Sequence, residues 1–251
     1  MSENKNIDLD TMIMNTDISN LDSQTKSKIL SLLEYKELQM YYTCALKEVK
    51  TKIEVLSTEF NVQYKRNPIS SIETRLKSTE SIITKLRKKN IPITLKNIKE
   101  QLSDIAGIRV ICSYIDDIYT IADALLKQDD IVLIEKKDYI VNPKPNGYRS
   151  LHLIIQIPIF LSTGKKNVKV EVQIRTIAMN FWASLEHQIK YKKKIENQEE
   201  ISKELIKCSE IINETDEKML SLRKQIEMAE DLNDDDTELI ERFKKIDVPI
   251  E

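Results

Sequence analysis

An alternating stretch in the second half of the chain places polar side chains with chemical potential on one strand face. Over residues 169–175 apolar and polar residues alternate, and the polar set is Glu171, Gln173 and Arg175. Because successive side chains of a β-strand point to opposite faces, a carboxylate, an amide and a guanidinium share one side. Such a face either lines a polar cleft or meets solvent, and alternation alone favours solvent.

A second carboxylate stands directly before another β-rich stretch. Asp104 precedes residues 105–114, which include Gly107. A glycine inside a strand has no side chain to pack and can mark the close approach of a ligand or of another backbone. Magnesium prefers oxygen ligands and completes its shell with waters and phosphates, so Asp104 and Glu171 can together hold one Mg²⁺ ion. Each acid alone is more often a cap or a surface charge.

The densest group of polar and aromatic side chains lies in residues 136–152. Its Asn146-Gly147 pair predicts a tight turn. The strand predicted after this turn carries three polar residues on one face, namely Tyr148, Ser150 and His152. A tyrosine beside cationic groups can stack on a base, an interaction worth about 1–3 kcal/mol. A plain hairpin with a half-buried tyrosine and a hydrogen-bonded histidine fits the pattern equally well.

Residues 64–89 form a basic block in a chain whose formal net charge is −2. Four of its polar residues recur at positions i, i+4, i+8 and i+11, namely Lys77, Ser81, Lys85 and Lys88. On one helix they would present ammonium groups and a hydroxyl along a single face. A basic block inside a slightly acidic chain favours a polyanion site over a generally basic surface. A solvated lysine face is the common alternative.

The composition excludes several classes of protein. The 251 residues contain only 3 glycines, at positions 107, 147 and 164, too far apart for a dinucleotide-binding or phosphate-loop motif. Any phosphate must therefore be held mostly by side chains. No apolar run approaches the roughly 20 residues of a membrane span, and the polar residues 1–20 do not resemble a signal peptide. The 3 separated cysteines favour reduced thiols and a cytoplasmic location.

The spacing of apolar residues predicts the elements that must position these groups. Helices are expected over residues 42–60, from Ser70 or Ser71 to Lys89, and over 95–102, 116–127 and 176–194. Strands are expected over residues 105–114, 131–140, 148–157 and 167–175, the last two joined by a turn at 162–164. This order predicts an α+β or mixed α/β fold with a mixed sheet of four or five strands flanked by helices.

A heptad pattern marks the C-terminal part of the chain. The apolar positions, with one polar exception, are Ile201, Leu205, Cys208, Ile212, Thr215, Met219, Leu222 and Ile226. These residues, which we call the C-terminal seam, predict a long amphipathic helix. The seam packs either on its own domain or on a second subunit, and the pattern favours neither.

Together these stretches resemble the synthetase domain of the RelA/SpoT-homologue family, specifically its stand-alone small alarmone synthetases. The resemblance covers roughly residues 25–225. It is carried by residues 104–110 (DIAGIRV), 142–152 (NPKPNGYRSLH) and 171–192 (EVQIRTIAMNFWASLEHQIKYK), with Arg75, Lys77, Ser81 and Lys85. It implies a nucleotidyltransferase-like fold and transfer of the β,γ-pyrophosphate of ATP to the 3′-hydroxyl of GDP or GTP. The preferred acceptor among GMP, GDP and GTP stays open.

The resemblance also implies a role for each matching residue. The ATP phosphates would be bound by Arg75, Lys77, Ser81, Lys85 and Lys88, with Arg87 as an alternative to Lys88. Arg109 would lie near the adenine. Asp104 would hold Mg²⁺, and Glu171 would assist it or act as base on the 3′-hydroxyl. Tyr148 would stack on guanine, and the acceptor nucleotide would be surrounded by Lys144, His152, Gln173, Asn180 and Glu186.

The implied domain plan has a flexible lead-in, a catalytic domain, an amphipathic helix for oligomerisation and an acidic tail with a short helix. Their ranges are 1–24, 25–195, 196–230 and 231–251. Small members of the family are commonly homotetramers, so a homotetramer is expected, without a membrane partner. The two histidines both lie in the synthetase motifs, so alarmone hydrolysis, which needs a metal-binding His-Asp set, is not expected.

Two other functions remain open at this point. One is a different nucleotidyltransferase, which would release pyrophosphate instead of AMP. The other is an RNA-binding oligomer without catalytic activity, which would use the basic block and bind in a salt-sensitive way.

Overall fold

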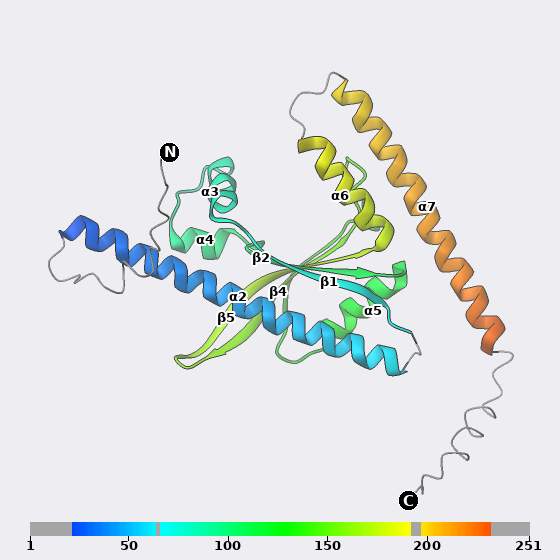
Figure 1. The fold of residues 1–251 in the computed structure, drawn as a ribbon, viewed down its shortest axis with the longest axis horizontal. Helices are drawn as coiled ribbons and strands as arrows, with labels where there is room; N and C mark the ends of the chain where they lie inside the picture. Colours follow the sequence, from blue (N-terminus) through cyan, green and yellow to red (C-terminus); the bar gives the residue numbers. More distant parts are fainter. Residues whose placement is uncertain (1–21, 64–65, 192–196, 232–251) are drawn as a thin grey trace, which may run out of the picture.

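The computed structural model describes residues 22–63, 66–191 and 197–231. In chain order its elements are α2 (Ser23–Gln63), β1 (Ile69–Leu76), α3 (Thr79–Lys88), α4 (Leu95–Gln101), β2 (Ala106–Cys112), α5 (Ile115–Leu126), β3 (Val132–Asp138), β4 (Leu151–Leu161), β5 (Gly164–Thr176), α6 (Ile177–Tyr191) and α7 (Gln198–Asp231) (Figure 1). None of the helices that the structure describes has the length and apolar character needed to cross a bilayer. Most of the expected lead-in and nearly all of the expected acidic tail lie outside the described residues.

The strands form one mixed sheet in the order β1-β2-β5-β4-β3. The central strands β2 and β5 run parallel, and every other neighbouring pair is antiparallel. β4 and β5 form a hairpin in which Leu161 pairs with Gly164, as the turn signal at residues 162–164 predicts. The expectation of an α+β fold with a mixed sheet of up to five strands is confirmed.

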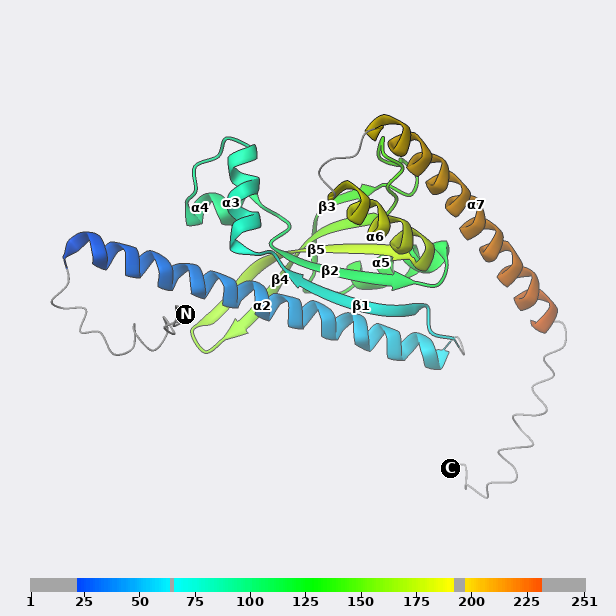
Figure 2. The same cartoon turned by 45° about the horizontal axis from the view of Figure 1, so that its top comes forward.

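The strand register gives this sheet one apolar face and one polar face. Ile108 of β2 lies beside Val172 of β5, and both are almost fully buried. The next residues in each strand, Arg109 and Gln173, also lie beside one another but point to the opposite face. Helices α2 and α5 pack on the apolar side, and α2 crosses β1, β2, β5 and β4 (Figure 2). The polar face is thereby left open for a binding site.

Helix α2 is held on the sheet by the apolar stripe that the sequence predicts. Every residue of the stripe is at most 7% exposed, namely Tyr42, Leu46, Val49, Ile53, Leu56 and Phe60. Burying a side chain of this size contributes roughly 1.5–3 kcal/mol relative to leaving it exposed. The helix extends beyond the stripe at both ends and stops before the Asn67-Pro68 pair.

The prediction for residues 69–76 was wrong. They form strand β1 instead of the first turns of a helix beginning at Ser70 or Ser71, and α3 starts only at Thr79. The reason is a long-range ladder, in which β1 pairs with β2 from Ile69–Cys112 to Leu76–Ala106 and outweighs the local apolar spacing. Ser78 caps α3 by accepting a hydrogen bond from the Ser81 N–H. Lys77 therefore precedes the helix, and the expected single helical face of basic residues does not form.

The C-terminal seam is buried only in part. Ile201, Leu205 and Ile212 are half-buried on the protein's own domain, where α7 packs against α6 and α5. The remaining seam residues are exposed in the single chain, namely Cys208, Thr215, Met219, Leu222 and Ile226. Packing on the protein's own domain therefore accounts for only some of the seam residues.

Helix α3 offers a stability test of its corrected start. The structure buries Ile82 and Leu86 and leaves Ile83 half-buried. We expect Ile82→Ala to lower the free energy of unfolding by about 2–5 kcal/mol, because it opens a cavity beneath the helix. Ile83→Ala is the matched control and should cost clearly less in chemical denaturation. Equal losses for the two variants would contradict this placement of α3.

Candidate active-site cleft

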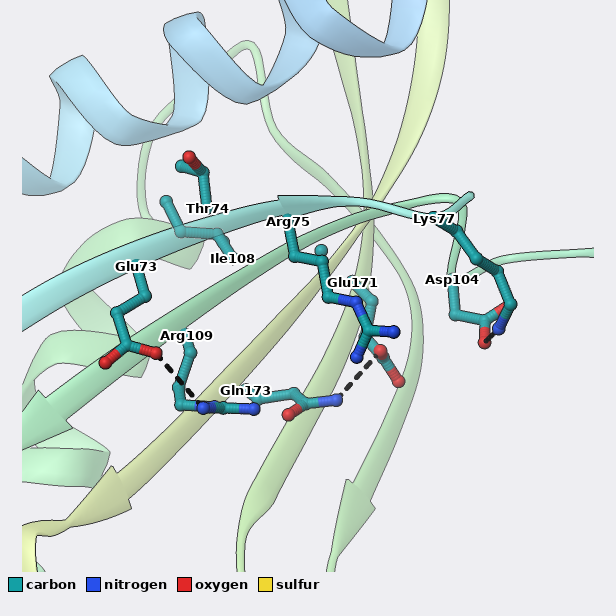
Figure 3. A pocket seen from close by; sticks show the side chains of 10 residues that line it. Glu73, Thr74, Arg75, Lys77, Asp104, Ile108, Arg109, Glu171 and Gln173 are labelled. Carbon is teal, nitrogen blue, oxygen red and sulfur yellow. Dashed lines mark hydrogen bonds and ion pairs between the residues drawn. The ribbon is translucent and has the colours of Figure 1, made fainter. Parts of the chain in front are cut away.

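A cleft of about 460 Å³ opens on the polar face of the sheet. Its walls come from β1, β2 and β5 and from the segments that follow β1 and precede β2 (Figure 3). Among its lining residues are the predicted site residues Arg75, Lys77, Asp104, Arg109, Glu171 and Gln173. Residues distant in sequence are thus brought to one cavity.

Gly107 forms the floor between the two sides of the cleft. It pairs with Arg75 on β1 and with Glu171 on β5, so these two side chains flank it. Figure 3 shows the Arg75 guanidinium pointing toward the Glu171 carboxylate above this floor. A methyl group at position 107 would meet the Arg75 carbonyl oxygen at 3.7 Å, an ordinary contact. No neighbouring backbone excludes a side chain at position 107. The contribution of this glycine is the open space that it leaves in the cleft.

Asp104 holds two ammonium groups on one oxygen. Its Oδ2 atom accepts hydrogen bonds from Nζ of Lys77 and of Lys85, both at 2.6 Å. Its Oδ1 atom is buried and has no hydrogen-bond partner among the described residues. Burial acts to raise the pKa of Asp104, but the two lysines outweigh it and hold the pKa below the ordinary value. The carboxylate is thus ionised and keeps one oxygen available for a cation.

Glu171 lies on the neighbouring strand and is also held as a carboxylate. Its Oε2 atom accepts a hydrogen bond of 2.9 Å from the Gln173 amide, and Oε1 lies 3.3 Å from Nδ1 of His152. Burial raises the pKa of Glu171, yet the hydrogen bonds from His152 and Gln173 bring it below the ordinary value. The charge of Asp104 acts in the opposite direction, so the two carboxylates influence each other electrostatically. Glu171 can accept a proton or a cation in the cleft.

Tyr148 connects this carboxylate to a group of cations. Its hydroxyl lies 2.8 Å from Nε2 of His152 and accepts a hydrogen bond of 2.5 Å from Nη2 of Arg175. The Lys144 ammonium lies 4.6 Å from the centre of the Tyr148 ring and 4.5 Å from that of Tyr139. Burial raises the pKa of the Tyr148 phenol, so the side chain stays neutral. A neutral half-buried ring among cations is suited to bind an aromatic base.

The remaining predicted site residues are near this group or outside it. Asn180 Oδ1 lies 3.5 Å from Nη1 of Arg175, and Glu186 accepts a hydrogen bond of 3.0 Å from the Asn146 amide. Ser81 accepts one of 2.8 Å from the Ser78 hydroxyl at the start of α3. Lys88 and Arg87 are exposed near the end of α3 and do not line the cleft.

The predicted start of the strand at Tyr148 was wrong. Strand β4 begins at Leu151, so Tyr148 lies in the preceding segment rather than in the strand. Ser150 is fully buried, and its hydroxyl donates to the carbonyl oxygen of Ile174 at 3.2 Å and accepts a hydrogen bond of 3.4 Å from Nε of Arg175, whose Nη2 bonds to Tyr148. Tyr148 and His152 do meet, but because the loop turns back and not because a strand alternates.

Three further residues belong to the site although the sequence assigned them no role. Arg175 is 4% exposed and contacts both Tyr148 and Gln173, and its alternation with Glu171 and Gln173 was a usable signal. Glu73 accepts a hydrogen bond of 3.1 Å from Arg109 across the β1–β2 ladder. It was missed because β1 was predicted as a helix. Tyr139 is visible only in three dimensions, through its edge-on contact with Tyr148.

Comparison with known proteins gives consistent relatives. The family model described as "Region found in RelA / SpoT proteins" matches residues 74–196. GTP pyrophosphokinase YwaC of Bacillus subtilis is 46% identical over 194 residues, which span 77% of this chain and 92% of that protein.

Solved structures are similar over the same part of the chain. Small alarmone synthetase 1 from Bacillus subtilis, bound to its product pppGpp, has a TM-score of 0.71 at 35% identity. That match covers 77% of this chain and 98% of the other. The same enzyme bound to AMPCPP has a TM-score of 0.65 at 33% identity over 78% and 98% of the two chains. With its cleft, its motifs and these relatives together, the chain belongs to the RelA/SpoT family.

Proposed function

We propose that this chain is a GTP pyrophosphokinase that transfers the β,γ-pyrophosphate of ATP to the 3′-hydroxyl of GDP or GTP and releases AMP. The observation that carries the proposal is the cleft in which basic side chains surround two ionised carboxylates. A relative that is 46% identical is named GTP pyrophosphokinase, and similar structures bind pppGpp and AMPCPP. The activity proposed is synthesis alone, without hydrolysis of the product.

The reaction requires alignment and charge more than covalent work by the protein. The 3′-oxygen attacks the β-phosphorus of ATP, and the bond from that phosphorus to the oxygen bridging to the α-phosphorus breaks. AMP leaves with the bonding electrons, and the 3′-hydroxyl proton passes to Glu171, whose carboxylate is ionised in the cleft. The product carries the pyrophosphate on the 3′-oxygen of the guanosine nucleotide.

The donor side of the site is assigned to β1, β2 and α3. Arg75, Lys77 and Lys85 bind the ATP phosphates, with Ser81 and Lys88 or Arg87 further along α3. Lys77 and Lys85 both bond to Asp104. An incoming phosphate therefore competes with Asp104 for these ammonium groups, and salt will screen the attraction. Arg109, oriented by Glu73, takes the place beside adenine.

A divalent cation fits the same cleft. Asp104 Oδ1 is a buried carboxylate oxygen without a hydrogen-bond partner, and Glu171 lines the same cavity. The described residues contain no cluster of three or more His, Cys, Asp or Glu side chains that would enclose a metal ion. Two protein carboxylates with the rest of the shell left to waters and phosphates suit Mg²⁺. Bound there, Mg²⁺ would neutralise charge that develops on the phosphates.

The acceptor side is assigned to the loop before β4, the end of β5 and the start of α6. Tyr148 stacks on guanine, and the groups around the acceptor are Lys144, His152, Gln173, Asn180 and Glu186. Guanine binding must rearrange Lys144, whose ammonium lies over the Tyr148 ring. Burial lowers the pKa of Lys144, which reduces the cost of moving it from this position.

The chain is proposed to act in the cytoplasm as a homotetramer. Support for assembly comes from the exposed residues of the C-terminal seam, together with the exposed Ile177, Phe181 and Leu185 on α6. Apolar side chains spaced regularly along helices are typical of subunit interfaces. The free cysteines Cys44, Cys112 and Cys208 suit a reducing compartment.

The base assignment is tested with Glu171→Gln. We expect turnover to fall by about 10²–10⁴-fold, because the amide cannot accept the 3′-hydroxyl proton. Nucleotides are resolved by chromatography after incubation with ATP, GDP and Mg²⁺, and AMP and pyrophosphate are quantified. Glu135→Gln, an exposed change on β3, is the matched control. Unchanged turnover would reject the base role, and release of pyrophosphate instead of AMP would identify a different nucleotidyltransferase.

Tyr148 provides a separate test of the acceptor side. Tyr148→Ala should raise the KM for GDP by about 5- to 150-fold, the equivalent of a lost stacking contact, and leave the KM for ATP nearly unchanged. Tyr148→Phe keeps the ring and loses the hydroxyl contacts, so its KM for GDP should lie between wild type and Tyr148→Ala. A parallel rise in both KM values in steady-state kinetics would disprove the stacking role.

Assembly is tested at the exposed end of the C-terminal seam. Replacing Leu222 and Ile226 together by Glu should lower the mass of the particle, because charges in an apolar interface are costly to bury. Light scattering after size exclusion measures that mass. Ser221→Ala, on an exposed position of the same helix, should leave it unchanged. A double variant with the wild-type mass would show that the seam is not the interface.

A further inference from the structure

The inner face of α7 contacts the domain through polar bonds in addition to the half-buried residues of the seam. The carbonyl oxygen of Leu205 accepts a hydrogen bond of 2.8 Å from the Trp182 indole of α6. At intervals of about one and two turns further on, Ser209, Asp216 and Arg223 each bond to another part of the domain. Residues at such spacing return to the same side of a helix, so these bonds define one docking face.

Ser209 holds the peptide that leads into Tyr148. Its hydroxyl donates a hydrogen bond to the carbonyl oxygen of Gly147. Gly147 has a φ of +87°, and a Cβ there would lie 2.8 Å from the Ser209 Cβ, so only glycine fits against the helix. The held carbonyl belongs to the planar peptide unit whose nitrogen is that of Tyr148. Ser209 thereby fixes the orientation of the peptide plane from which the Tyr148 backbone continues.

Asp216 holds the start of α6 in a comparable way. Its Oδ2 atom accepts a hydrogen bond of 2.5 Å from the Thr176 hydroxyl, and both residues are buried. The same hydroxyl oxygen accepts the N–H of Met179 at 3.0 Å and so caps α6. Thr176 directly follows Arg175, and α6 carries Asn180 and Glu186.

The two bonds therefore end next to Tyr148 and Arg175, whose side chains bond to each other. We propose that Ser209 and Asp216 are positioning residues for the acceptor nucleotide: α7 holds the Tyr148 loop with one and the Arg175–α6 junction with the other. The inference rests on the proposed function. The residues proposed to bind ATP lie on other elements, β1, β2 and α3. Loss of either bond should therefore weaken binding of the acceptor nucleotide and leave ATP binding unchanged.

The first variant is Ser209→Ala, which removes one hydrogen bond and keeps the space for Gly147. Loss of one such bond corresponds to a change of about 5-fold in an equilibrium constant, so the KM for GDP should rise by about that factor. The KM for ATP should stay near the wild-type value. Ser221→Ala is the matched control on the same helix and should behave as wild type in every measurement.

The second link is tested through its partner on α6. Thr176→Val keeps the shape of the side chain and removes the hydroxyl, whereas Thr176→Ser keeps the hydroxyl. We expect a raised KM for GDP in the valine variant and a wild-type KM in the serine variant. A purely structural role for Thr176 would instead raise the KM values for GDP and ATP together, and that result would overturn the inference.

Calorimetric titration of GDP separates this inference from the proposed function. Absence of AMP formation by the wild-type protein would defeat the proposed function, while GDP affinity would still decide the role of α7. Weaker GDP binding by Ser209→Ala than by wild type supports the positioning role. Equal affinity in the two proteins, or no GDP binding by either, overturns it.

Discussion

The parallel pairing of β2 with β5 is the contact on which the site depends. It places Gly107 beside Glu171 and Arg109 beside Gln173, and the antiparallel pairing of β1 adds Arg75 next to Gly107. A slip of one residue in a strand would exchange its two faces. The polar side chains would then point into the layer between the sheet and α2, and the apolar residues would meet solvent. Burial of residues such as Val172 therefore fixes where the charged groups lie.

Charge balance inside the cleft follows from this register. Asp104 pairs with both Lys77 and Lys85, and Glu171 accepts contacts from His152 and Gln173. Ionised groups that leave water are costly unless they are paired, and these contacts offset part of that cost. A polyphosphate can displace the carboxylate from the lysines only if that carboxylate gains another partner. A divalent cation on Asp104 would supply that partner, which connects donor binding to the metal.

The sequence predicted those parts of the structure that local patterns determine. The stripe of α2, the alternation of β5 and the turn before Tyr148 all depend on residues close together in the chain. Strand β1 depends instead on a partner at least 30 residues further along, so the local spacing of Ile72 and Leu76 was compatible with a helix. Because Glu73 lies on that strand, its contact with Arg109 was missed for the same reason.

Within the candidate site, side-chain types were a better guide than predicted faces. Asp104 and Glu171 share a cavity as expected. Arg175 could be placed on the correct face by alternation, but its contact with Tyr148 depends on a loop whose path is set by a glycine and by α7. No pattern within residues 142–152 predicts the path of this loop, because the residue that holds Gly147 is Ser209 in the distant helix α7.

Helix α7 shows that a heptad pattern predicts only some of the contacts that a helix makes. The pattern selects apolar residues and treats Ser209, Asp216 and Arg223 as surface positions, yet these make the docking bonds. The exposed residue Leu222 is the direct neighbour of Arg223 in the chain. One helix thus presents the exposed residues of its seam outward and polar bonds toward the acceptor side. Because a helix moves as a nearly rigid rod, a second subunit seated on the seam would restrain the same helix that holds Tyr148.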